Sequence, residues 1–400
     1  MINFILELLG PFLTDRGWYG LIRPIDSLFQ QLAFRVFCAV GVSFAVVVFL
    51  GPRVIRWLTL KKIGDSPEFN HAELNEKMRS KANTPTMGGV LIAAAVVASA
   101  MLLADLRNDY VVMGFVVILW HAGIGAIDDW LKLTAATRGE GSRQGLRSWE
   151  KLVAQLGLGV VIGWFAYQVG ATGAEAALAE AERMAHVLNL PLQRTYVPPT
   201  MEPNAQLLYM TPIVYTAVMT LFMAGMSNAV NITDGMDGLA AGIGAVVSFG
   251  LIALCLLVGS DDWARGQLVP YVPGSGELAV LAGALAGAVG GFLWFNCSPA
   301  AVFMGDTGSL LIGGLIGYIA VVIRMEYVVI IMSAVYLWEI VTVVIQVGYF
   351  KSTGGKRVFR CAPYHHHLHM LGWPEQRIVA RFWIVTVLAT AFALATLKLR

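Results

Sequence analysis

Charged residues are scarce in this chain of 400 residues. They make up 14% of it, against about 25% in an ordinary soluble domain, whereas 57% of the residues are hydrophobic. A soluble protein of this length could not bury so much apolar surface in its core, so the composition indicates that a lipid bilayer surrounds the chain. Long apolar runs recur from end to end. We therefore expect a single membrane domain over residues 1–400 in place of two or three soluble domains.

Cysteine is also rare. The four cysteines, Cys38, Cys255, Cys297 and Cys361, lie far apart and lack CxxC spacing, which argues against both a disulfide framework and a zinc cluster. The first residues, MINFILELLGPFL, contain no basic residue and include a glutamate. We therefore expect no cleaved signal peptide.

Ten apolar runs approach the length that crosses a membrane, which takes about 20 residues for roughly 30 Å of hydrocarbon. Such segments should be helices, because hydrocarbon offers backbone groups no other hydrogen-bond partner. The sequence thus predicts an all-α polytopic membrane protein. The expected helices lie at about 30–50, 87–104, 110–127, 152–169, 208–226, 239–258, 277–295, 307–323, 327–350 and 380–397.

Lysine and arginine are unevenly distributed over the loops between these runs. One alternating set of loops holds 17 of the 28 Lys and Arg, and the opposite set, with both termini, holds about nine. The positive-inside rule places the first set in the cytoplasm, and ten spans then put both termini on the periplasmic side. The predicted cytoplasmic loops are 51–86, 128–151, 227–238, 296–306 and 351–379.

Two further patterns concern packing and the outer side. The long outer loop near 170–207 looks like a short surface helix. Glycines spaced four residues apart at 283–291 and at 313–317 indicate close approach of helices. They could mark a dimer seam, but tight packing within one bundle is the simpler interpretation.

The polar clusters of interest all fall on the predicted cytoplasmic side, and ionisable residues at a membrane edge are functional candidates by default. The first cluster is Asp128 and Asp129 with Lys132. Adjacent carboxylates repel each other, which favours a metal, another cation or a proton between them. The alternative is a solvated helix end with one salt bridge between Asp128 and Lys132.

A second cluster is the segment NAVNITDGMDGLA. Its members Asn228, Asn231, Asp234 and Asp237 recur every three residues, so they share a helical face or line a turn. Gly235 would let the backbone approach a ligand closely. The alternative is a polar loop between two helices.

A third cluster begins the eighth apolar run, where Asp306 is followed by Thr307, Gly308 and Ser309. A helix N-terminus built of small residues is suited to phosphate, and a carboxylate there could hold Mg²⁺ against phosphate oxygens. The alternative is that Asp306 only caps the helix. Phe303, just before it, could belong to the core or stack on a base.

Two more segments indicate a functional site only when they are considered together with the first three clusters. In the fourth, His365, His366, His367 and His369 suggest metal or phosphate binding, but successive helical histidines point about 100° apart and could not share one metal. In the fifth, KMRSKANTPTMGG, the basic residues could be ordinary membrane anchors, and the turn after them could cradle phosphate.

Together these segments resemble the polyprenyl-phosphate N-acetylhexosamine-1-phosphate transferase superfamily, and within it the phospho-N-acetylmuramoyl-pentapeptide transferases. The triple histidine followed by Gly-Trp distinguishes this branch from the GlcNAc-1-phosphate transferases. The matching segments, in family order, are TPTMGG at 84–89, DDWLK at 128–132, NAVNITDGMDGLA at 228–240, FNCSPAAVFMGDTGSL at 295–310 and APYHHHLHMLGW at 362–373.

The resemblance implies a fold of ten transmembrane helices with both termini outside, often as a homodimer, in the bacterial inner membrane. It implies transfer of phospho-MurNAc-pentapeptide from UDP-MurNAc-pentapeptide to undecaprenyl phosphate, giving lipid I and UMP, with Mg²⁺ as cofactor and no nucleic-acid partner. The lipid phosphate could attack directly, or an aspartate could act first as nucleophile. A GlcNAc-1-phosphate transferase is the alternative enzyme. A transporter is the alternative of another class, but it should show internal repeats, which this sequence lacks.

The resemblance also implies roles for individual residues. The expected catalytic residues are Asp128, Asp129 and Asp306, with Asp306 as the metal ligand. The loop after Asp129 is longer than expected, so no basic residue beyond Lys132 is assigned there. The expected substrate-binding residues are Lys81, Thr86, Lys132, Asn231, Asp234, Gly235, Met236, Asp237, Asn296, Phe303, Gln346, His365, His366 and His367.

Overall fold

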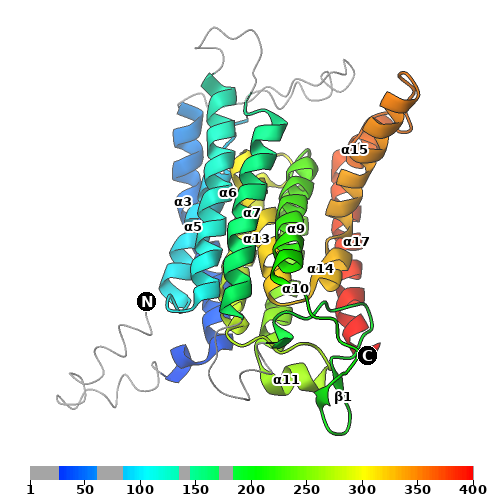
Figure 1. Ribbon diagram of the computed structural model, residues 1–400. Helices are drawn as coiled ribbons and strands as arrows, with labels where there is room; N and C mark the ends of the chain where they lie inside the picture. The colour runs from blue at the N-terminus through cyan, green and yellow to red at the C-terminus, as the bar shows by residue number, and fades with distance from the viewer. Residues whose placement is uncertain (1–26, 61–83, 135–144, 171–182, 400) are drawn as a thin grey trace, which may run out of the picture.

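The computed structural model describes residues 27–60, 84–134, 145–170 and 183–399. Long helices dominate this part of the chain and run roughly parallel to one another (Figure 1). They are α3 (Leu32–Leu60), α5 (Gly89–Leu103), α6 (Asp109–Thr134), α7 (Ser148–Val169), α9 (Pro212–Thr233), α10 (Leu239–Val258), α12 (Leu278–Asn296), α13 (Gly305–Val322), α15 (Ala334–Ser352) and α17 (Glu375–Thr396).

Short elements connect the long helices. The helical ones are α11 (Asp261–Gly266), α14 (Glu326–Met332), α16 (Tyr364–Met370) and the 3₁₀ turns η2 (Ser275–Glu277) and η3 (Leu397–Leu399). The strands β1 (Tyr196–Val197) and β2 (Glu202–Pro203) form an antiparallel hairpin in which Tyr196 lies opposite Pro203.

The predicted all-α polytopic membrane protein is confirmed. Each of the ten predicted runs coincides with a long apolar helix, and in the described part nine helices are long and apolar enough to cross a membrane. The tenth, α5, is apolar but has only 15 residues. The sides on which the termini lie stay a prediction.

Several helix boundaries differ from the prediction. Helix α3 continues to Leu60, and α9 continues to Thr233, so its polar last turns are helix and not loop. The predicted run 327–350 is divided into α14 and α15 at Ser333, whose φ of −92° and ψ of 16° leave the helical region. The short surface helix predicted near 170–207 falls largely on residues 171–182, which lie outside the described residues, and from residue 185 the chain forms turns and the β1–β2 hairpin.

The regularly spaced glycines pack inside the bundle. A side chain at Gly283 would approach the backbone oxygen of Val36 to 3.0 Å, and one at Gly291 would approach that of Phe44 to 3.0 Å. The glycines at 313 and 317 meet the backbone of α9 in the same way. These contacts confirm packing within one bundle, which was the simpler interpretation.

Helix α13 lies inside the bundle and carries the site at its N-terminus. It packs against α5, α6 and α9, and most of its residues are fully buried. The C-terminal ends of α6 and α9 therefore lie beside the first turn of α13 (Figure 1). This arrangement brings three of the polar clusters predicted from the sequence to one end of the molecule.

Candidate active site

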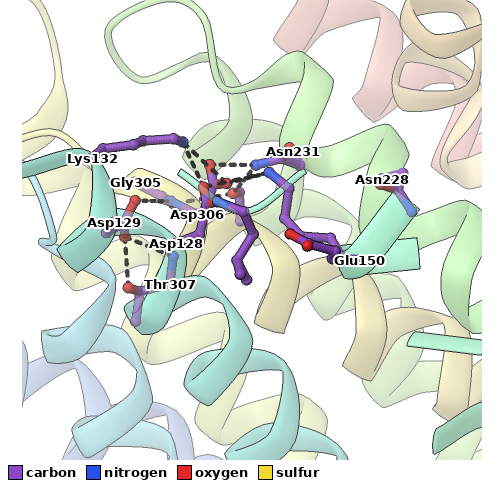
Figure 2. Close-up of polar contacts among 12 residues, drawn as sticks. Asp128, Asp129, Lys132, Glu150, Asn228, Asn231, Gly305, Asp306 and Thr307 are labelled. Atoms are coloured by element: carbon purple, nitrogen blue, oxygen red, sulfur yellow. Dashed lines mark hydrogen bonds and ion pairs between the residues drawn. The ribbon is translucent and has the colours of Figure 1, made fainter. Parts of the chain in front are cut away.

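The Asp129 carboxylate holds the first turn of α13. Its Oδ1 accepts a hydrogen bond from the backbone N–H of Asp306 at 3.0 Å, and its Oδ2 accepts from the backbone N–H and the hydroxyl of Thr307 at 3.0 and 2.7 Å (Figure 2). Gly305 has a φ of +72°, and a side chain there would come within 2.6 Å of Asp129 Oδ2. Asp129 thus caps α13 from a neighbouring helix and fixes the backbone of Asp306.

The TPTMGG segment pairs with the residues that precede α13. The N–H of Phe303 donates to the carbonyl of Pro85, and the N–H of Gly88 donates to the carbonyl of Phe303, both at 2.8 Å. A side chain at Gly89 would collide with the backbone of Gly308. These glycines therefore serve close backbone packing, and Thr86, two residues before Gly88, is buried.

Two ammonium groups lie between Asp128 and Asp306. Lys132 Nζ is 2.7 Å from Asp128 Oδ2 and 3.3 Å from Asp306 Oδ2. Lys151 Nζ is 3.4 Å and 2.9 Å from the same two oxygens. The backbone N–H of Leu146 also donates to Asp128 Oδ1 at 2.7 Å. The two carboxylates therefore face a strongly positive centre.

Lys151 was missed by the sequence analysis. It stands in the first turns of α7, 155 residues before Asp306, and no local spacing links the two. The only signal was its place as the last cation of the predicted cytoplasmic loop 128–151.

The acid cluster suits a divalent cation. Asp128, Asp129 and Asp306 each offer an oxygen within 4.8 Å of the others (Figure 2). Carboxylate oxygens are the ligands that Mg²⁺ prefers. Asp129 already accepts three hydrogen bonds from α13, whereas the Oδ2 atoms of Asp128 and Asp306 contact lysine ammonium groups, which a metal ion could displace. Asp128 and Asp306 are therefore the better candidates to hold a metal.

The end of α9 contributes an amide to the same cluster. Asn231 Nδ2 donates to Asp306 Oδ1 and to the Ser309 hydroxyl, both at 2.9 Å. Asn228, one turn earlier, donates instead to Gln155 on α7 at 2.6 Å. The three-residue spacing thus places both asparagines on one helical face, but only Asn231 reaches the carboxylates.

Asp234 follows directly after α9 and is half-buried. Desolvation, together with the neighbouring carboxylates of Asp306, Asp129 and Asp237, raises its pKa to about 8. The carboxyl group is therefore mostly protonated at neutral pH, and a cation bound nearby would favour its ionised form.

The remainder of this segment is tied down from two sides. The N–H of Asp237 donates to Glu375 Oε1 at 2.7 Å, and Asp237 Oδ2 accepts from the N–H of Ala300 at 3.1 Å. Met236 is buried in the core. Asp237 therefore links the start of α17 with the loop that leads to α13.

Asn296 likewise connects two segments of the chain. Its Oδ1 accepts from the N–H of Gly238 at 3.0 Å, and its Nδ2 donates to the carbonyl of Val302 at 2.8 Å. Asn296 is buried, so these contacts shape the turn that ends beside Phe303. Phe303 itself is half-buried.

The first two histidines of α16 lie against Gly235. The rings of His365 and His366 are 4.2 Å apart between centroids. A side chain at Gly235 would collide with His365 Nε2 and lie 3.4 Å from His366 Nε2. His365 Nδ1 lies 3.0 Å from Oε2 of Glu339, a buried residue of α15 that the sequence analysis also missed.

His367 and Gln346 organise a neighbouring loop. The N–H of Arg360 donates to His367 Nδ1 at 3.2 Å, and burial together with the Arg360 charge lowers the pKa of His367. Gln346 Oε1 accepts from the N–H of Phe359 at 2.9 Å, and its Nε2 donates to the Phe359 carbonyl at 3.2 Å. The three histidines therefore do not converge on one point.

The structure thus brings together part of the predicted set. One cluster holds Asp128, Asp129, Lys132, Asn231 and Asp306, and a second contact joins Gly235 to His365 and His366. Lys81 lies outside the described residues. The functional roles assigned to all these residues stay predictions.

Comparison with known proteins agrees with the geometry. Residues 111–324 match the family model of glycosyl transferase family 4, and residues 81–92 match phospho-N-acetylmuramoyl-pentapeptide-transferase signature 1. The chain is 38% identical over 390 residues to a phospho-N-acetylmuramoyl-pentapeptide-transferase of Desulfotalea psychrophila, covering 96% of this chain and 100% of that protein. The first match contains the whole acid cluster on α6 and α13.

Proposed function

Because the chain belongs to the phospho-N-acetylmuramoyl-pentapeptide-transferase family, we propose that it transfers phospho-MurNAc-pentapeptide from UDP-MurNAc-pentapeptide to undecaprenyl phosphate. The products are lipid I and UMP, and the reaction belongs to peptidoglycan biosynthesis. The observation that carries the proposal is the meeting of Asp128, Asp306, Lys132 and Lys151 at the first turn of α13. A helix N-terminus with cations beside it is suited to a pyrophosphate.

The chemistry that we propose is direct phosphoryl transfer. The second pKa of a phosphate monoester is about 6, so the lipid phosphate is mostly dianionic at neutral pH. Its oxygen attacks the β-phosphorus of the donor, a new P–O bond forms, and the bond to UMP breaks as UMP leaves with the electron pair. Lys132 and Lys151 neutralise phosphate charge, and Asp128 orients the lipid phosphate or removes its last proton.

Magnesium fits the donor set described above. Asp128 and Asp306 would hold the ion, which when bound neutralises the charge of the pyrophosphate. In the alternative two-step route, Asp129 is poorly suited to be the aspartate nucleophile, since both of its oxygens accept hydrogen bonds from α13.

The chain is a multi-pass membrane protein, and we propose that it lies in the bacterial inner membrane as a single domain with the site on the cytoplasmic face. The support is the charge of the loops, because 17 of the 28 Lys and Arg fall in the loop set that contains the acid cluster. Both termini then lie in the periplasm. A homodimer, which the resemblance implies, stays a prediction.

A donor assay tests the function. Purified enzyme receives radiolabelled UDP-MurNAc-pentapeptide or UDP-GlcNAc, with undecaprenyl phosphate and Mg²⁺. We expect labelled lipid and UMP from the first donor, and far less from the second. Equal rates would favour the GlcNAc-1-phosphate transferase. No UMP from either donor would contradict both enzymes and leave the transporter.

A further inference from the structure

Glu339 is a buried carboxylate that the proposed mechanism does not use. It lies on α15 and is fully buried, as is His365 on α16. The backbone N–H of His365 donates to the two carboxylate oxygens of Glu339 at 3.2 and 3.3 Å, and the His365 ring Nδ1 lies 3.0 Å from Glu339 Oε2. Among the ion pairs of the described residues, that with His365 is the only one that Glu339 makes. One contact of the ring and two of the backbone N–H therefore hold His365 against α15.

The other nitrogen of the same ring lacks a partner. His365 Nε2 is buried and has no hydrogen-bond partner within the described parts of the chain. It lies directly against Gly235, the residue that follows Asp234 after α9. Buried polar atoms are almost always hydrogen-bonded, so such an atom calls for an explanation, and a group supplied by a ligand is one.

Charge decides which kind of ligand atom fits. A buried carboxylate is costly without a cation, and the ring of His365 is its partner. With the Glu339 carboxylate at Nδ1, the ring donates from that nitrogen, and Nε2 is left for a ligand. An imidazolium ring, the cationic partner that suits a buried carboxylate, donates from Nε2 as well. A phosphate oxygen is the acceptor that matches it.

We propose that Glu339 is a positioning residue for the transfer reaction, which holds His365 so that its Nε2–H donates a hydrogen bond to a phosphate oxygen of the nucleotide donor. This inference rests on the proposed function. Gly235 has no side chain, so only backbone of the segment after α9 covers Nε2, and the proposal includes displacement of that segment when the phosphate oxygen binds. The hydrogen bond strengthens as UMP leaves with additional negative charge, and its loss therefore lowers kcat.

The test is a double-mutant cycle. Glu339→Gln keeps the shape but removes the charge that favours the doubly protonated ring. His365→Asn keeps an amide donor near the Nδ1 position and removes Nε2. We expect each to lower kcat by about 10- to 100-fold, as for other carboxylates behind a working histidine, with the KM for undecaprenyl phosphate unchanged. Because both changes remove the same hydrogen bond, the double variant should be within about 3-fold of His365→Asn.

Glu326→Gln is the matched control. Glu326 is another glutamate next to this helix pair, in α14, and it forms an ion pair with the buried Arg324, away from the acid cluster. Its change should affect thermal stability but not kcat. The double variant losing the product of the two single losses would overturn the proposal. A normal kcat in folded His365→Asn would also overturn the proposal, and this result does not require Glu339→Gln to fold. Absence of transfer by the wild type would instead refute the proposed function.

Discussion

Replacing Asp129 with asparagine should separate a positioning carboxylate from a reacting one. The Asp129 carboxylate is buried, and the hydrogen bonds that it accepts all come from the first turn of α13. An amide retains one acceptor oxygen. The other position becomes an NH₂ group that faces the N–H and hydroxyl of Thr307. The variant therefore loses the charge at the helix N-terminus and leaves a buried N–H without an acceptor.

The magnitude follows from these two losses. A buried donor without a partner costs about 1–3 kcal/mol. A carboxylate at a helix N-terminus contributes about 0.3–1 kcal/mol, and up to about 2 kcal/mol where it is partly buried. Together they predict a loss of about 2–4 kcal/mol in the free energy of unfolding. Because the Asp306 backbone depends on the same carboxylate, kcat of the folded enzyme should also fall, by roughly 100-fold for a displacement near 1 Å.

The assay compares unfolding in a graded denaturing detergent with kcat of the folded fraction. Asp109→Asn is the control, since Asp109 is an exposed acid in the first turn of the same helix, and it should change stability by no more than about 0.5 kcal/mol. If Asp129→Asn were inactive but as stable as the wild type, Asp129 would act on the substrates and the capping role would be refuted.

Three other substitutions test the remaining parts of the site. Asp306→Asn should abolish turnover and weaken the dependence on Mg²⁺ in a metal titration; near-normal activity in membranes would exclude Asp306 as the metal ligand. Lys151→Met should lower kcat by about 100-fold, because one of two cations at the phosphates is lost, whereas the exposed Arg147→Met should not; equal rates in both would remove Lys151 from the site. Phe303→Ala should raise the donor KM by roughly 5- to 150-fold with little change in kcat, if the ring stacks on uracil. Loss of thermal stability with an unchanged donor KM would instead make Phe303 a core residue.

The helices could be predicted from the sequence because hydrocarbon requires long apolar runs, but their ends could not. Helix α9 continues through Asn228 and Asn231, where hydropathy has already fallen. These side chains are tolerated because Gln155 and the Asp306 carboxylate accept their amide hydrogens. A hydropathy window detects where side chains become polar, whereas a helix ends where its backbone hydrogen bonds end. The difference arises at the site, where polar side chains find partners on other helices.

The acids of the site were found from the sequence, but Lys151 and Glu339 were not. Lys151 contacts Asp306 only because α7 and α13 meet in the folded chain. Glu339 had a sequence signal, since it is an ionisable residue inside the apolar run 327–350, and such residues are functional candidates. That signal identifies the residue but not its partner, His365, which comes 26 residues later on a separate helix.

The adjacent pair Asp128 and Asp129 shows how helix geometry divides two like residues between two tasks. Successive side chains on a helix point about 100° apart, so neighbouring carboxylates have different hydrogen-bond partners here. On α6, Asp129 faces α13 and fixes its first turn, while Asp128 faces the ammonium groups of Lys132 and Lys151. In the sequence, their repulsion suggested a shared cation. In the structure, backbone N–H groups of α13 stabilise the Asp129 charge, and lysines stabilise the Asp128 charge. Asp306 contacts the partners of both aspartates. Its backbone N–H donates to Asp129, and its carboxylate contacts the same two lysines as Asp128. In the proposed reaction, the centre therefore depends on a carboxylate that holds α13, Asp129, one residue away from the carboxylate proposed to act on the substrate, Asp128.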